Sequence, residues 1–128
     1  MAPSKIRKWY PYYIAGYDND GVPIYVIEYG HWKYAEALRS GTGKNDVGDT
    51  KDLTWRYFQQ GVYRLLRDSK KNNEQGVIAI FDYDGFSPSN FLYPAAIQMA
   101  LHEMAMLDKV CNVINRAYLI NSKCCSCK

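Results

Sequence analysis

The stretch Gly76-Val-Ile-Ala-Ile-Phe-Asp-Tyr-Asp-Gly-Phe86 decides the fold of this 128-residue chain. Five apolar residues, at positions 77–81, follow one another between polar flanks and show no helical spacing. A short run of this kind, rich in β-branched residues, is typical of a parallel strand that is covered on both faces. Asp82, Asp84 and Gly85 mark the carboxyl end of this strand, which is the end where open α/β sheets bind their ligands.

The composition describes one small globular domain, with 48% hydrophobic and 23% charged residues. The formal net charge of +3 is too small to predict a nucleic-acid partner, although it is compatible with transient contact with an anionic membrane surface. No stretch approaches the ~20 apolar residues of a membrane span. Residues 1–8 carry charge and lead into no apolar run, so we expect a cytoplasmic protein without a secretory leader.

The pattern along the chain alternates between strands and helices. The expected strands cover residues 24–29, 77–82 and 117–120, and the expected helices cover residues 53–68 and 94–109. An extended segment at 12–17 is expected to pair with the first of these strands through the turn Asp18-Asn-Asp-Gly21. This order predicts an α/β fold, with a mostly parallel sheet joined by helical crossovers and one face or edge of the sheet poorly covered.

The remaining segments are expected to be irregular. Residues 1–8 are predicted to be a flexible N-terminus, and residues 30–51 a long polar surface loop. Within the helix at 94–109, an apolar stripe predicts the buried face. That stripe consists of Ile97, Ala100, Leu101, Met104 and Leu107.

The four cysteines predict no metal site. Cys124 and Cys127 form a C-x-x-C pair, but no second pair and no suitably spaced histidine completes a zinc site. Cys111 stands alone, and Cys125 belongs with the pair to a cysteine-rich tail at residues 122–128. We therefore expect neither a metal nor another cofactor.

Three stretches, in this order, resemble one known family. The segment Tyr10-Pro-Tyr-Tyr-Ile-Ala-Gly-Tyr-Asp-Asn-Asp-Gly-Val-Pro-Ile-Tyr-Val-Ile-Glu-Tyr-Gly30 resembles the opening of a CRAL-TRIO lipid-binding domain. This is the family of cellular retinaldehyde-binding protein, α-tocopherol transfer protein and the yeast-type phosphatidylinositol transfer proteins. Residues 76–87 are similar to its central strand, and Ala117-Tyr-Leu-Ile-Asn121 to its next strand. The resemblance covers residues 9–121 and implies a partial domain, truncated at both ends of the family fold.

The resemblance implies a sheet floor with helices around an apolar pocket for one small lipid or isoprenoid. Binding, with transfer as a further expectation, would then need no catalysis, because an oily cavity binds by removing apolar area from water. Alternate residues of two strands would share the face that lines the pocket. The expected ligand-contacting residues are Tyr25, Ile27, Tyr29, Val77, Ala79 and Phe81.

Two other functions stay open on the sequence. The segment Ile78-Ala-Ile-Phe-Asp-Tyr-Asp-Gly85 also resembles the first motif of haloacid dehalogenase-type phosphatases, in which Asp82 would attack phosphorus and Asp84 would act as acid and base, with magnesium at the strand end. Alternatively, Asp82 and Asp84 only cap the turn that follows the strand. The third hypothesis is a protein-interaction module, or a non-functional fragment of a lipid-binding domain, that pairs through its uncovered sheet.

Overall fold

The computed structural model describes residues 4–39, 46–71 and 75–122. The elements, in chain order, are α1 (Ser4–Trp9), β1 (Tyr12–Tyr17), β2 (Pro23–Ile27), α2 (Tyr34–Arg39), α3 (Asp46–Lys71), β3 (Val77–Asp82), α4 (Pro94–Lys109) and β4 (Ile114–Ile120). Short 3-10 turns at Tyr29–His31, Pro88–Phe91 and Cys111–Val113 join some of them.

The four strands form one mixed, mostly parallel sheet. The strand order is β1-β2-β3-β4, in which β1 pairs antiparallel with β2 and the other two pairs are parallel. Tyr25, Ala79 and Ala117 stand side by side across the three parallel strands. The predicted α/β fold class is therefore confirmed, and β3, the apolar run of the sequence, occupies a central position in the sheet.

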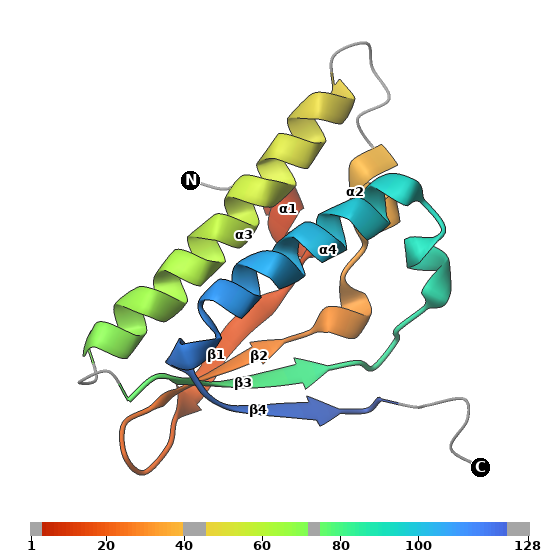
Figure 1. Cartoon of the computed structure of the whole chain (residues 1–128). Helices are drawn as coiled ribbons and strands as arrows, with labels where there is room; N and C mark the ends of the chain where they lie inside the picture. The colour runs from red at the N-terminus through yellow and green to blue at the C-terminus, as the bar shows by residue number, and fades with distance from the viewer. Residues whose placement is uncertain (1–3, 40–45, 72–74, 123–128) are drawn as a thin grey trace.

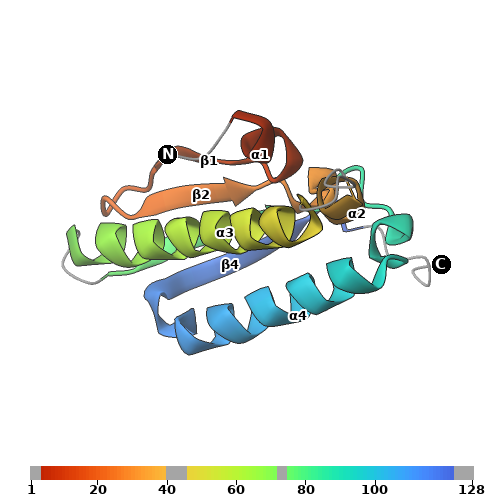
Figure 2. The ribbon, with the colours of Figure 1, turned by 90° about the horizontal axis from the view of Figure 1, so that it is seen from above.

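Helices α3 and α4 lie next to each other on one face of the sheet (Figures 1 and 2). The stacked rings of Trp55 and His102, with centroids 4.1 Å apart, join the two helices. The main apolar cluster lies where α1, α2 and α4 meet, and it includes the completely buried Ile6, Tyr10, Tyr34 and Leu38. The sheet is thus a floor under two long helices, and the short helices close one end.

The tip of the β1–β2 hairpin forms the predicted turn. The Asp18 carboxylate accepts hydrogen bonds from the backbone N–H groups of Asp20 and Val22, both at 2.9 Å, and Gly21 takes the positive φ of 81° that the turn needs. Asp18 also lies 3.5 Å from Arg116 of β4, although two strands separate β1 from β4 in the sheet. The hairpin tip therefore crosses the sheet face opposite α3 and α4.

Several predicted boundaries agree closely with the structure. Strands β1 and β3 and helix α4 have the expected bounds, whereas β2 begins at Pro23 and ends at Ile27, and β4 begins earlier, at Ile114. Helix α3 is longer than the expected 53–68. Strand β4 is exposed from Asn115 onward, so the poorly covered sheet edge that the sequence predicted is present in the described part.

Three sequence-based expectations need correction. Residues 1–8 are not a loose segment throughout, because α1 begins at Ser4 and buries Ile6 completely. The expected loop at 30–51 contains helix α2 and the first turns of α3. The buried face of α4 also differs from the predicted stripe. Its buried residues are Ala96, Met99 and Glu103, whereas Ile97, Leu101 and Met104 are exposed.

In the described ranges, no helix is long and apolar enough to cross a membrane. Cys111 is exposed and carries a free thiol. Cys124, Cys125 and Cys127 lie outside the described residues, as does most of the predicted tail at 122–128.

Candidate functional site

A cavity of about 230 Å³ lies between the sheet and the two long helices. Its floor comes from all four strands, where alternate side chains rise toward the helices. The floor residues are Tyr12, Tyr25, Ile27, Ala79, Phe81 and Ile114. Ala79 is the smallest of them and lies at mid-strand, with Tyr25 beside it on β2, so the floor is lowest near Ala79.

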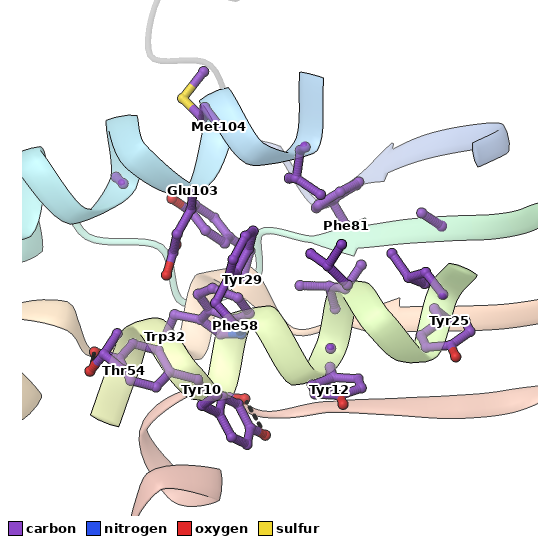
Figure 3. A pocket seen from close by; sticks show the side chains of 18 of the residues that line it. Tyr10, Tyr12, Tyr25, Tyr29, Trp32, Thr54, Phe58, Phe81, Glu103 and Met104 are labelled. Carbon is purple, nitrogen blue, oxygen red and sulfur yellow. Dashed lines mark hydrogen bonds between the residues drawn. The ribbon is translucent and has the colours of Figure 1, made fainter. Parts of the chain in front are cut away.

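The roof of the cavity is built by α3 and α4. The α3 residues are Phe58, Gly61, Val62 and Leu65, and the α4 residues are Ala100, Glu103, Met104 and Leu107. Spacings of three and four place each set on one face of its helix, toward the sheet. Met104 stands at the outer rim with 63% of its surface exposed, so the cavity opens to solvent beside α4 (Figure 3).

One end of the cavity is closed by a cluster of aromatic side chains, which we call the aromatic end. It comprises Tyr10, Tyr29 and Trp32, which Figure 3 labels, and Tyr34, which packs against the ring of Tyr10. The Tyr10 ring meets Trp32 and Tyr34 edge to face, at centroid distances of 5.4 and 5.5 Å. The Tyr10 hydroxyl shares a 3.1 Å hydrogen bond with the Thr54 hydroxyl. These contacts, from two connecting segments and from helices α2 and α3, hold the aromatic end in one arrangement.

Glu103 reaches the aromatic end from the roof, where it hangs from α4 toward α3 (Figure 3). It is only 4% exposed, and one of its carboxyl oxygens accepts a hydrogen bond from the Tyr34 hydroxyl. Burial raises the pKa of Glu103 from 4.5 to about 8, against the opposing effect of the bond from Tyr34. At neutral pH this side chain is therefore mainly an uncharged carboxylic acid.

The opposite end holds a second pair of tyrosine and carboxylate. The Tyr25 hydroxyl donates a 2.6 Å hydrogen bond to Asp68, near the end of α3. Burial raises the pKa of Tyr25 above its usual value, so this hydroxyl stays a donor. Asp68 does not line the cavity, and its other carboxylate oxygen lies 3.6 Å from Arg67. Glu103 is therefore the one acidic side chain among the described lining residues.

The structure brings five of the six predicted site residues together. Tyr25, Ile27, Tyr29, Ala79 and Phe81 all line the cavity. Val77 does not line it and is completely buried beside Ile114. Whether these side chains contact a ligand stays a prediction. Sequence reasoning missed the aromatic end beyond Tyr29, and it missed Glu103.

The carboxylate at the end of β3 has a local role in the structure. Asp82 accepts hydrogen bonds from the Asn121 side chain, at 2.9 Å, and from the backbone N–H of Asp84, at 3.0 Å. The bond from Asn121, followed by that from Asp84, lowers the pKa of Asp82. Within the described ranges, no three carboxylate, histidine or cysteine side chains gather where a metal ion could be held. Asp82 thus joins β3 to the end of β4.

A second hollow, of about 470 Å³, lies on the other side of Trp32. It is more polar, and its lining includes Lys33, Glu36, Arg39 and Ser87. The indole of Trp32 donates a 2.9 Å hydrogen bond to the carbonyl oxygen of Pro11, which fixes the ring between the two spaces. Two basic side chains, Lys33 and Arg39, line the second hollow, whereas the described lining of the apolar cavity contains no lysine, arginine or histidine.

Comparison with known proteins places this arrangement in a family. No curated protein matches the chain. Among protein families, the CRAL/TRIO domain matches residues 7–122, a range that includes nearly all of the described elements and both walls of the cavity. CRAL/TRIO domains are in general non-catalytic lipid-binding modules. The chain therefore belongs to the CRAL/TRIO family of lipid-binding domains.

Proposed function

We propose that the chain binds one small lipid or isoprenoid molecule without catalysis, in the cavity between its sheet and helices α3 and α4. The observation that carries the proposal is the character of this cavity, which is lined almost entirely by aliphatic and aromatic side chains. Each 100 Å² of ligand surface removed from water contributes about 2.5 kcal/mol of favourable free energy. A cavity of this kind therefore binds by shape and apolar contact.

The opening beside α4 supports a role in transfer as well as in binding. Met104 is both a lining residue and 63% exposed, and Leu101 of the same helix is 60% exposed. A methionine side chain is unbranched and adapts to different apolar partners. A lipid that leaves a membrane could enter through this rim with little displacement of the floor.

Native mass spectrometry of the whole chain, purified from the cells that express it, tests the proposal. We expect one lipid adduct per chain, and recovery of that adduct when delipidated protein is incubated with a lipid extract. Ala79→Trp places a bulky side chain on the floor, at a cost of about 1–3 kcal/mol in stability, and should abolish the adduct.

Ile80→Trp is the matched control, because Ile80 is next on the same strand and its side chain points to the opposite face of the sheet. The control should retain the adduct, and circular dichroism should show both variants folded. A well-folded wild-type chain that carries no lipid and takes up none would overturn the proposal and favour the interaction-module hypothesis.

A further inference from the structure

At the aromatic end of the cavity, Glu103 uses only one of its two carboxyl oxygens in a hydrogen bond to the described part of the chain. Tyr34 donates to one carboxyl oxygen of Glu103, but the other oxygen has no hydrogen-bond partner among the described residues. In those residues, every fully buried side-chain nitrogen or oxygen has a partner, so this second oxygen is not sealed off. Glu103 is 4% exposed and is one of the residues that line the cavity, so the open space next to its side chain is the cavity.

The charges around Glu103 determine what it can bind. The titratable groups that interact with Glu103 are Tyr10, Tyr29 and Tyr34. All three are uncharged near pH 7, and burial raises their pKa values further above the ordinary value of 10. No basic side chain among the described lining residues offsets a negative charge. Burial also raises the pKa of Glu103 to about 8, so near pH 7 it carries one O–H donor and a free acceptor lone pair.

This set of groups suits one kind of ligand end. An alcohol hydroxyl both donates and accepts, so it can accept from the Glu103 carboxylic acid and donate in return. A carboxylate or phosphate at the same place would be an unpaired buried charge, which is strongly unfavourable. A plain hydrocarbon end would leave the polar oxygen of Glu103 without a partner.

We propose that the cavity selects an uncharged lipid alcohol, whose hydroxyl binds Glu103 at the aromatic end while its apolar chain extends along the floor toward Tyr25. This proposal rests on the lipid-binding function proposed above and names the ligand class for that function. Tyr34 holds Glu103 in place and is not itself required to touch the ligand. The polar end of the lipid is thus recognised by a residue of the cavity roof, Glu103 of α4, and not by the sheet.

Binding of four probes with the same twelve-carbon chain tests the proposal. The probes are 1-dodecanol, dodecane, dodecanoate and dodecyl phosphate, titrated into the whole delipidated chain at pH 7. Tryptophan emission reports binding, because Trp32, one of the three tryptophans of the chain, lines the cavity, and calorimetry confirms the stoichiometry. We expect dodecanol to bind about tenfold more tightly than dodecane, as one buried hydrogen bond provides, and both anions to bind more weakly than the alcohol.

Two variants of Glu103 isolate the interaction. Glu103→Gln keeps a donor and an acceptor, so the preference for dodecanol over dodecane should remain within about threefold of the wild-type value. Glu103→Leu removes both, and the preference should fall about tenfold while dodecane binding is retained. Retained dodecane binding shows that the leucine variant is folded, and the glutamine variant supplies a second folded control.

The possible results separate the two proposals. If none of the four probes binds, the proposed lipid-binding function fails. If they bind with no preference for the alcohol, or if Glu103→Leu leaves that preference unchanged, the ligand-class proposal is wrong and the lipid-binding function stands. Tighter binding of dodecyl phosphate, weakened by Lys33→Ala or Arg39→Ala, would also overturn it and would place the polar end of the lipid in the second hollow.

Discussion

Gly61 offers a way to fill the cavity from its roof without disturbing the sheet. A Cβ at this position would lie 3.8 Å from the Tyr12 hydroxyl oxygen, which is an ordinary van der Waals distance. Replacing a mid-helix glycine by alanine stabilises a helix by about 1 kcal/mol. A leucine would in addition bury its side chain in the cavity, and it would point back toward Phe58 and the aromatic end.

We therefore expect Gly61→Leu to stabilise the lipid-free chain by about 2–3 kcal/mol, the helix contribution plus part of the 1.5–3 kcal/mol for burying a leucine. An upper limit comes from the cavity itself. At about 24 cal/mol per Å³, an empty space of about 230 Å³ corresponds to about 5.5 kcal/mol. The same substitution should remove lipid binding, because it occupies the space that the lipid would fill.

Urea unfolding of the delipidated protein measures the first effect, and native mass spectrometry measures the second. Gly61→Ala is the matched control, with about 1 kcal/mol of added stability and retained lipid binding. A leucine variant less stable than the alanine variant would show that the space is not available to a side chain. A leucine variant that binds lipid as well as the wild type would refute the location of the site.

Three further outcomes are expected. Because the pKa of Glu103 is about 8 when folded and 4.5 ordinarily, the folded chain keeps a proton that the unfolded chain releases, so the free energy of unfolding should fall between pH 4.5 and pH 8 and then level off. In Glu103→Gln that fall, on the order of 5 kcal/mol in urea titrations, should vanish; an unchanged pH profile would contradict the burial of this carboxyl. Gly30→Ala should destabilise the fold by about 3 kcal/mol or more in thermal melts, because a Cβ there overlaps the backbone carbonyl oxygen of Asp84, whereas Gly21→Ala, with open space around it, should cost about 1 kcal/mol. Asn121→Ala should raise the pKa of Asp82 toward its usual value in an NMR titration without affecting lipid binding, and a Mg²⁺-dependent phosphatase activity that Asp82→Asn abolishes would revive the enzyme hypothesis.

The elements with strong local signals were predictable from the sequence. The apolar run of β3, the Asp-Asn-Asp-Gly turn after β1 and the proline at the start of α4 each fix a boundary by local chemistry. Helices α1 and α2 have only six residues each, too few to be stable alone. They form because Ile6 and Leu38 are buried in the shared core, which a local pattern does not reveal.

The candidate site likewise contains residues that the sequence pattern indicated and residues that it did not. Alternation along β2 and β3 indicated the floor, because a strand has a fixed period of two. The aromatic end joins Tyr10, Trp32 and Tyr34 through loops and a short helix, and no spacing rule relates them. In α4 the predicted stripe found part of the face that meets the sheet, because Ala100, Met104 and Leu107 line the cavity. It did not find the buried residues Ala96 and Met99, because apolar residues occupy more than one side of this helix. Glu103 lies four residues after the buried Met99, and that spacing was the available signal.

The position of β4 at the edge of the described sheet determines how fast its backbone amide protons exchange with solvent. Among the described strands it pairs with β3 alone, and its residues from Asn115 to Ile120 are exposed. Successive amide groups of such a strand point alternately toward β3 and away from the sheet. In deuterated water, β4 should therefore show a pattern with a period of two, in which every second amide exchanges rapidly and its neighbours exchange slowly. Strand β3, which is paired on both sides, should hold its protons along its whole length.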